Sequence, residues 1–258
     1  MSEELKINIP LNFGLFWSGS KLSYLRYLTF VSLRHFHPDS TIDLYVSSKC
    51  VKDGYKWANE KQDFEIDIGE DYTERLKDLG VVIHEINDFA QYQPNFQSDF
   101  FRWWYLKEFG GFYLDTDQII LKSFNGLPLY KNLIYSAYGP YFPVGVIGAS
   151  KISVVVKRVN KVIKNHYNPN DYNSLGPWMF RDVMKSMDIK EGYNAPKHIF
   201  YPINFSHDVN KIYSGKFEVP DGSRSLHWFG GHPLSQKFNK AYSEEMLKTS
   251  NDTISRWC

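Results

Sequence analysis

Hydrophobic and polar positions alternate in two different ways along the first part of the chain. Residues 7–17 form an extended run that ends in a glycine-containing turn, and residues 22–35 then carry leucine and valine at helical spacing. Pro38 ends this helix, and residues 41–47 form a compact β-type run. A strand, a helix and a second strand in this order predict a β-α-β unit with parallel pairing, which favours an α/β fold.

The rest of the chain continues this alternation. Strands are expected at residues 79–86, 112–114 and 144–149, and helices at residues 96–109, 152–164, 179–187 and 242–248. Residues 51–75 are polar and lack a clear period, which indicates a surface excursion that could flank a binding site. Because no linker or repeat interrupts the pattern, residues 1–258 are expected to form one domain with an irregular part from about residue 190.

Composition narrows the class of protein. An apolar share of 43% and a charged share of 23% are those of an ordinary globular protein. A formal net charge of +1 gives no broad positive field for phosphate neutralisation, so nucleic acid is not expected as a partner. The high aromatic content of 17% suits stacking on nucleobases and sugar rings, although most of these side chains are expected in the core.

The cysteines and the hydropathy profile predict a compartment. Only Cys50 and Cys258 occur, and their placement suggests neither a disulfide framework nor a metal-binding pair. No signal-peptide run and no stretch approaching a transmembrane segment is visible. We therefore expect a protein of a reducing compartment, the cytoplasm, with peripheral membrane association left open.

Two aspartates follow the strand expected at residues 112–114. Asp115 and Asp117 are two residues apart, so on an extended backbone both carboxylates project to the same side and can converge on one cation. Ligands of open α/β sheets bind at the carboxyl ends of strands. Two carboxylates suit Mg²⁺ or Mn²⁺, which leave positions for substrate phosphates. The pair predicts a metal site for a diphosphate-bearing substrate, and a plain turn is the alternative.

Asp99 and Arg102 stand three residues apart at the expected start of a helix, so they share one face of its first turn. In a purely structural account, Ser98 caps the helix and Asp99 and Arg102 form a surface pair. In the functional account, this helix end faces the strand before Asp115. Asp99 would then bind sugar or ribose hydroxyls, and Arg102 would hold the sugar or a phosphate oxygen.

These residues belong to one longer pattern, S-D-x-x-R-x-x-x-L-x-x-x-G-G-x-Y-x-D-x-D. It consists of Ser98, Asp99, Arg102, Leu106, Gly110, Gly111, Tyr113, Asp115 and Asp117. The pattern resembles the DXD signature of the sugar-binding glycosyltransferases of family 32, a theme shared with capsule enzymes and glucosylating clostridial toxins. The resemblance implies a GT-A fold, which is a Rossmann-like nucleotide-binding domain with a mostly parallel central sheet flanked by helices.

The resemblance also implies roles for the residues of the pattern. Asp115 and Asp117 would bind Mn²⁺ or Mg²⁺, and Asp99, Arg102 and Asp115 would act in catalysis and in binding of the nucleotide-sugar donor. Gly111 and Tyr113 would contact the donor as well.

Other segments resemble the family more loosely. Trp17 ends a run similar to the family's opening strand and would border the nucleobase, although the usual histidine of that strand is missing and core packing is the alternative. Gly176 and Pro177 resemble a turn beneath the donor sugar, for which a plain loop is the alternative. His227 resembles a late histidine that completes the metal sphere, with His232 as a rival. His35 and His37 are expected at the surface, where a helix ends.

Taken together, the resemblance implies a retaining, metal-assisted glycosyltransferase. Because secretory-pathway enzymes of the family usually carry an N-terminal membrane anchor and none is visible here, it also implies a cytoplasmic enzyme of a bacterium or of a virus-infected host. The enzyme would move a hexose or an N-acetylhexosamine from a nucleotide-diphosphate sugar, UDP-linked rather than GDP-linked, to a hydroxyl of a glycan, glycolipid or glycoprotein. A phosphatase of the haloacid dehalogenase type is one alternative, because Asp115-Thr116-Asp117 resembles its strand-ending motif, although Gln118-Ile119 and the mid-chain position argue against it. A non-catalytic sugar-binding protein on the same fold is the other.

Overall fold

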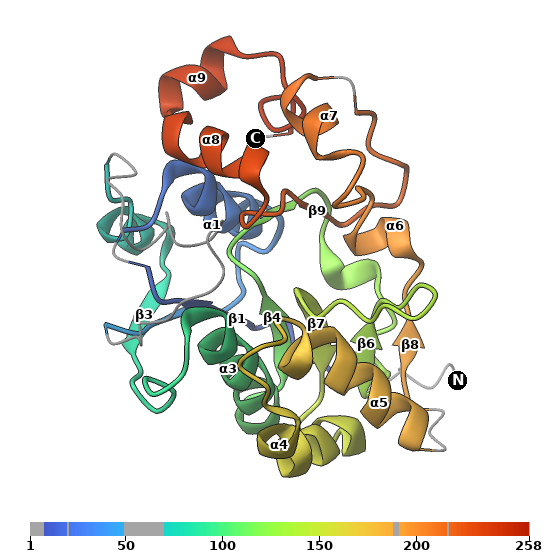
Figure 1. The fold of residues 1–258 in the computed structure, drawn as a ribbon. Coiled ribbons are helices and arrows are strands. Elements are labelled where there is room, and N and C mark those ends of the chain that lie inside the picture. The colour runs from blue at the N-terminus through green and yellow to red at the C-terminus, as the bar shows by residue number, and fades with distance from the viewer. Residues whose placement is uncertain (1–7, 20, 49–69, 188–190, 216, 258) are drawn as a thin grey trace.

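A central sheet with helices on both sides forms the body of the protein (Figure 1). The computed structural model describes residues 8–19, 21–48, 70–187, 191–215 and 217–257. Most of the surface excursion expected at residues 51–75, together with Cys50 and Cys258, lies outside the described residues.

The seven-stranded sheet has the order β3-β2-β1-β4-β7-β6-β8, and β5 and β9 form a separate two-stranded sheet. The strands are β1 (Phe13–Trp17), β2 (Ile42–Val46), β3 (Val82–Glu85), β4 (Gly111–Leu114), β5 (Gln118–Ile120), β6 (Leu133–Tyr135), β7 (Val146–Ala149), β8 (Tyr193–Asn194) and β9 (Ser225–His227). The β1–β2, β1–β4, β2–β3 and β6–β8 pairs are parallel, whereas β7 is antiparallel to β4 and to β6. The predicted α/β class with a mostly parallel sheet is therefore confirmed.

Helices pack on the sheet and extend beyond it. The α-helices are α1 (Tyr24–Phe36), α3 (Pro94–Glu108), α4 (Val154–His166), α5 (Met179–Ser186), α6 (Lys197–Phe200), α7 (Val209–Tyr213), α8 (Pro233–Ala241) and α9 (Glu244–Thr249). Short turns of other helix types are η1 (Glu74–Leu79), η2 (Phe124–Gly126) and η3 (Ser174–Trp178). Figure 1 shows α3, α4 and α5 on one side of the sheet, and α1 with the C-terminal helices α8 and α9 on the other.

The two faces of the sheet follow from the period of a strand, in which successive side chains point to opposite faces. On β1, Phe13 and Leu15 join the core beneath α1, whereas Phe16 joins the core against α3. Position 14 requires a glycine, because the ring of Tyr105 in α3 lies where a side chain would be, with the nearest ring atom 2.4 Å from the Cβ position. Helix α3 can therefore approach the sheet closely, which brings its polar residues to the end of β4.

Glycines separate α3 from β4, as the sequence predicted. Gly110 and Gly111 both have positive φ, 69° and 90°, a backbone conformation that glycine adopts without steric cost. A Cβ on Gly111 would stand 2.4 Å from the carbonyl oxygen of Asn12. The chain thus reverses within two residues, so that α3 and β4 lie against each other and Asp115 emerges beside the polar side chains of α3.

The start of α3 corrects one prediction. The helix begins at Pro94, which lacks a backbone N–H and is suited to a first helical position, and Gln93 precedes it at the N-cap. Ser98 is therefore inside the helix rather than at its cap, and its hydroxyl donates to the carbonyl oxygen of Asn95. Asp99 and Arg102 accordingly belong to later turns of α3 and not to its first turn.

His37 corrects a second prediction. It was expected on the surface at the end of α1, but its side chain is only 3% exposed, whereas His35 is exposed as expected. The His37 ring packs between Phe13 and Phe124, and its Nε2 accepts a hydrogen bond from the Phe124 backbone. Burial, together with the nearby Arg224, lowers the pKa of His37 to about 4, so this histidine is a neutral member of the core.

The part of the chain from about residue 190 contains more regular structure than its composition suggested. Helix α9 lies close to the helix expected at residues 242–248, but α8 and strand β9 were not predicted. Strand β9 pairs antiparallel with β5, and this pairing sets His227 opposite Gln118. A residue more than a hundred positions downstream thereby arrives beside the two aspartates.

Candidate active site

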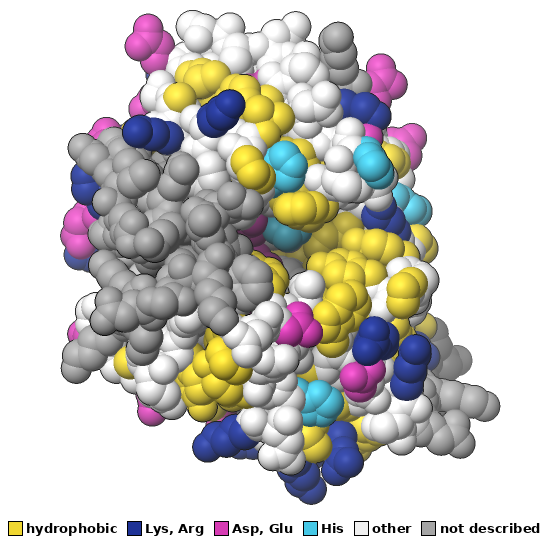
Figure 2. All heavy atoms as spheres, in the orientation of Figure 1, with side chains coloured by type: hydrophobic (Ala, Val, Ile, Leu, Met, Phe, Trp, Pro, Cys, Tyr) yellow, Lys and Arg dark blue, Asp and Glu magenta, His cyan; other side chains and the backbone are white. Residues whose placement is uncertain are grey.

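A cavity of about 910 Å³ opens where β1 and β4 end. Its walls come from the end of β1, from α3, from the turn at residues 115–117, from residues 143–145 and from loops of the C-terminal part. Figure 2 shows a hollow near the middle of this face, with acidic and histidine side chains visible inside it and hydrophobic side chains beside it. The position agrees with the rule that ligands of open α/β sheets bind beyond the carboxyl ends of strands.

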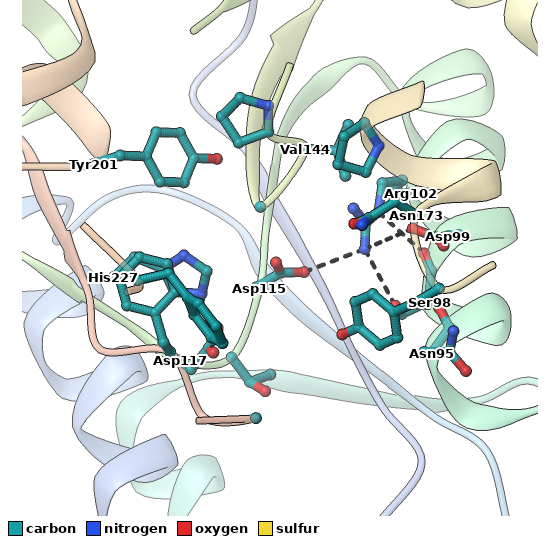
Figure 3. Close-up of a pocket in the computed structure, with 18 of the residues that line it drawn as sticks. Asn95, Ser98, Asp99, Arg102, Asp115, Asp117, Val144, Asn173, Tyr201 and His227 are labelled. Carbon is teal, nitrogen blue, oxygen red and sulfur yellow. Dashed lines mark hydrogen bonds and ion pairs between the residues drawn. The ribbon is translucent and has the colours of Figure 1, made fainter. Parts of the chain in front are cut away.

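Three potential metal ligands converge in this cavity. Single ligand atoms of Asp115, Asp117 and His227 all lie within 4.8 Å of one another. The aspartates do not share one extended strand as expected, because β4 ends at Leu114 and Asp117 stands in a turn before β5. Convergence therefore depends on this turn and on β9, and the pairing of β5 with β9 brings in His227 (Figure 3).

The environment of Asp117 keeps its carboxylate charged. Oδ2 accepts a hydrogen bond from the backbone N–H of Gly230 at 2.7 Å and lies 3.0 Å from Nε2 of His227. Burial alone would raise the pKa of Asp117, but the charge and hydrogen bond of His227, with smaller contributions from Arg26 and Gly230, hold it below its ordinary value. The same pairing raises the pKa of His227 against the opposing effect of its burial.

These residues fit a divalent cation. Two carboxylates and an imidazole form a suitable donor set for Mn²⁺ or Mg²⁺. In addition, Nδ1 of His227 is buried and has no hydrogen-bond partner among the described residues. The nitrogen beside Asp117 is Nε2, so the fit to a cation rests on the donor set, and a bound ligand or water would be the partner of Nδ1.

A second network lies on the α3 side of the cavity. The Arg102 guanidinium is 3.2 Å from Oδ1 of Asp99 and 3.4 Å from Oδ1 of Asp115, and it lies over the ring of Tyr113. The Tyr113 hydroxyl donates to the same Asp115 oxygen at 2.6 Å. Burial would lower the pKa of Arg102, but Tyr113, Asp99 and Asp115 raise it above its ordinary value, so Arg102 stays a cation. Figure 3 shows how this network links α3 to the end of β4.

Trp17 lines the cavity at the end of β1, but its side chain is mostly covered. It is 8% exposed, and its indole N–H donates to the carbonyl oxygen of Lys21. The guanidinium of Arg26 lies 4.2 Å from the ring centre, and Gly19 packs against the ring edge. Only a small part of the Trp17 ring is therefore available to a ligand in the cavity.

The other predicted donor contacts fall at different places. Pro177 lines the cavity, and Gly176 lies just behind the wall, with its Cβ position 3.3 Å from Oδ1 of Asp99. Gly111 is at the opposite end of β4 from Asp115 and does not line the cavity. Its positive φ and its close approach to Asn12 explain why this position requires a glycine. The prediction that Gly111 contacts the donor does not agree with this geometry.

His232 was the rival of His227 for the metal. Its Nδ1 accepts a hydrogen bond from the backbone N–H of Leu234, and the residue stands at the N-cap of α8. His232 is absent from the group of potential ligands that the described residues form around Asp115 and Asp117. His227 is therefore the histidine that the fold brings to the aspartates.

The sequence did not single out two polar residues of the cavity. Arg26, in the first turn of α1, donates to Oγ1 of Thr116 at 2.8 Å and packs beside Trp17 and Trp228. Tyr201, just after α6, extends its hydroxyl toward the middle of the cavity (Figure 3). The segment that contains Arg26 was interpreted only for its helical spacing, and the segment that contains Tyr201 was interpreted as irregular. No spacing rule therefore marked either residue.

The match to known proteins agrees with this arrangement. Residues 30–134 match the family model described as the glycosyltransferase sugar-binding region containing DXD motif, and the matched range includes the whole stretch from Ser98 to Asp117. The chain therefore has the fold of the GT-A glycosyltransferases, and residues 30–134 are similar to the DXD sugar-binding region.

Particular solved structures share the fold. The PaToxG glycosyltransferase is 20% identical with a TM-score of 0.52, and the comparison covers 69% of this chain and 68% of that one. The apo structure of the bifunctional glycosyltransferase WbbM is 12% identical with a TM-score of 0.50, and the comparison covers 93% of this chain and 51% of that one. This chain thus corresponds to about half of WbbM. No curated protein matches the sequence.

Among the residues that the structure describes, we find no helix with both the length and the apolar character needed to cross a membrane.

Proposed function

We propose that the protein is a metal-dependent, retaining glycosyltransferase that transfers a hexose or an N-acetylhexosamine from a UDP-sugar to a hydroxyl group of a glycan, glycolipid or glycoprotein. The observation that carries this proposal is the convergence of Asp115, Asp117 and His227 beside the Asp99–Arg102 pair in one cavity. Membership of family 32 and retention of configuration rest on the resemblance of the Ser98–Asp117 pattern. A cytoplasmic location rests on the cysteine content.

In this proposal, Asp115, Asp117 and His227 hold Mn²⁺ or Mg²⁺. The cation supplies Lewis-acid neutralisation of the charge that develops on the departing diphosphate. The protein's own residues orient the donor: Asp99 accepts hydrogen bonds from sugar hydroxyls, and Arg102 supplies a fixed positive charge beside the sugar. Because the site is recessed, water is partly excluded, which strengthens these interactions.

Ligand-induced stabilisation tests the proposal directly. We expect UDP and Mn²⁺ together to raise the melting temperature by roughly 5 °C or more at saturating concentrations, and each alone to have a smaller effect. The measurement is a thermal-shift screen of UDP- and GDP-sugars with and without Mn²⁺, followed by detection of released UDP. A protein that hydrolysed an aryl phosphate and ignored nucleotides would be a phosphatase, and sugar binding indifferent to both metal and nucleotide would indicate a non-catalytic protein.

Mn²⁺ affinity is expected to rise with pH. In the metal-free protein Asp117 raises the pKa of His227, so His227 keeps its proton to a higher pH than an ordinary histidine, and a cation must displace that proton. Calorimetric titration with Mn²⁺ at pH 6, 7 and 8 should therefore show progressively tighter binding. His227→Gln should weaken binding and flatten this pH dependence.

A matched variant controls for the loss of a histidine–aspartate pair. Nε2 of His84 lies 2.8 Å from Oδ1 of Asp43 at the sheet edge, and neither residue lines the cavity. His84→Gln should leave both the Mn²⁺ affinity and its pH dependence as in the parent protein. Affinity that does not change with pH in the parent protein would contradict the assignment of His227 as a ligand.

A further inference from the structure

Asp115 and Tyr201 both approach Gly145 in the cavity wall, and Asp115 takes up the space that a side chain at this position would need. The Cβ position of Gly145 is 2.5 Å from Oδ2 of Asp115 and 3.4 Å from the hydroxyl oxygen of Tyr201. Gly145 itself is fixed, because its carbonyl oxygen accepts a hydrogen bond from the Asp115 backbone at 2.8 Å. Gly145, Asp115 and Tyr201 all line the cavity, so this part of the wall would face a substrate.

Tyr201 presents a hydrogen-bond donor in this part of the wall. Its side chain is 2% exposed, and its hydroxyl oxygen accepts a hydrogen bond from the backbone N–H of Val146 at 2.8 Å. The hydroxyl hydrogen has no acceptor among the described residues. Burial raises the pKa of Tyr201 well above its ordinary value, so the hydroxyl keeps this hydrogen at neutral pH. The hydroxyl lines the cavity, so a ligand bound there can supply the acceptor.

Asp115 presents the complementary acceptor. Its Oδ1 is engaged by Tyr113 and by Arg102, whereas Oδ2 accepts no hydrogen bond from the described residues and lies beside Gly145. A carboxylate oxygen has two lone pairs, so Oδ2 can contact the proposed cation and still accept a hydrogen bond, and a single hydroxyl can donate to Oδ2 while accepting from Tyr201. Figure 3 shows Tyr201 and Asp115 reaching into the cavity from two sides, with Arg102 farther along the wall.

We propose that Tyr201, together with Asp115 beside Gly145, recognises one hydroxyl group of the transferred sugar and thereby determines specificity for the donor. This inference rests on the proposed function and assigns it a residue outside the motif region. A neutral hydroxyl in the cavity beside these two side chains can donate to the carboxylate and accept from the phenol, whereas the carboxylate of a uronic acid has no proton to donate to Asp115.

The test is a double-mutant cycle between Tyr201→Phe and donors that lack one hydroxyl. Affinities of UDP, UDP-glucose, UDP-galactose and their monodeoxy analogues are measured calorimetrically with Mn²⁺ present. Tyr201→Phe should weaken the preferred UDP-hexose about tenfold and leave UDP itself unchanged, because UDP has no sugar. One deoxy analogue should bind the parent protein about tenfold more weakly than the intact sugar does, but Tyr201→Phe less than about twofold more weakly. The hydroxyl missing from that analogue is then the one that Tyr201 contacts.

Tyr105→Phe controls for the structural cost of losing a buried phenol. The Tyr105 hydroxyl also accepts an N–H, from the side chain of Asn12 at 3.0 Å, and the residue is 1% exposed outside the cavity. This variant should lower the melting temperature to a similar extent without changing donor affinities.

Four outcomes would overturn the inference. Equal loss of UDP and UDP-sugar affinity in Tyr201→Phe would assign the residue to the diphosphate or to the local structure. If the effects of Tyr201→Phe and of removing a hydroxyl on the binding free energy were additive for every deoxy analogue, no sugar hydroxyl would contact Tyr201. A change confined to the acceptor KM would move the contact to the acceptor. A parent protein that binds UDP but no UDP-sugar would overturn the proposed function together with the inference.

Discussion

Asp117→Asn is expected to remove metal-dependent transfer while leaving the fold intact. Mn²⁺ affinity should fall by at least about a hundredfold and the transfer rate by roughly a thousandfold, which corresponds to the several kcal/mol that a cation contributes to charge stabilisation. Asparagine keeps the shape of the side chain and can still accept the Gly230 N–H, so the loss reports the charge rather than the packing. Mn²⁺ titration and UDP release measure the two effects.

Asp43→Asn is the matched control for this variant. It also deprives a histidine, His84, of its carboxylate partner at 2.8 Å, but at a distance from the cavity. A comparable change in melting temperature with normal Mn²⁺ affinity is expected. If Asp117→Asn retained both Mn²⁺ binding and transfer, the metal site at Asp115, Asp117 and His227 would be wrong.

Arg102→Lys is expected to lower kcat/KM by about a hundredfold. Lysine keeps the charge but cannot hold the fixed planar geometry with which Arg102 contacts Asp99 and Asp115 at 3.2 and 3.4 Å. A displacement of about 1 Å in a catalytic group has an effect of this order. Mn²⁺ affinity should stay within about tenfold, because Arg102 is not a metal ligand and the charge beside Asp115 is retained. Initial rates over a range of donor concentrations separate the effects on kcat and KM.

Arg34→Lys controls for loss of an arginine with several hydrogen bonds. The guanidinium of Arg34 donates only to backbone carbonyl oxygens of the described residues, those of His37, Pro38, Ser40, Leu79 and Gly80. This variant should lower stability and leave kcat/KM unchanged. If Arg102→Lys behaved in the same way, Arg102 would be a structural residue, and its proposed contact with the donor sugar would be withdrawn.

The elements that the sequence predicted well are those with strong local signals. Periods of two and 3.6 residues marked β1, α1, β2 and α3, and the paired glycines after α3 marked the reversal into β4. The start of α3 was missed, because Pro94 and Gln93 carry a weaker signal than the apolar spacing that begins at Phe96. His37 was misplaced because hydropathy alone does not show that Phe13 and Phe124 close around a histidine ring.

The candidate site divides in the same way. Asp99, Arg102, Asp115 and Asp117 were identified by spacing within twenty positions of one another, since α3, the glycine reversal and β4 are consecutive. His227 was identified only through the family resemblance, and its place beside Asp117 depends on the pairing of β9 with β5.

By itself, the sequence determined the α/β class, the order of the main elements and the acidic motif, because each depends on contacts between residues that are close along the chain. Only the tertiary structure decided which histidine joins the aspartates, that Gly111 lies away from the cavity, and that Tyr201 and Asp115 both lie beside Gly145. These outcomes depend on contacts between segments far apart in the chain, and the packing of the whole sheet with its helices sets such contacts, which no local period of residues encodes.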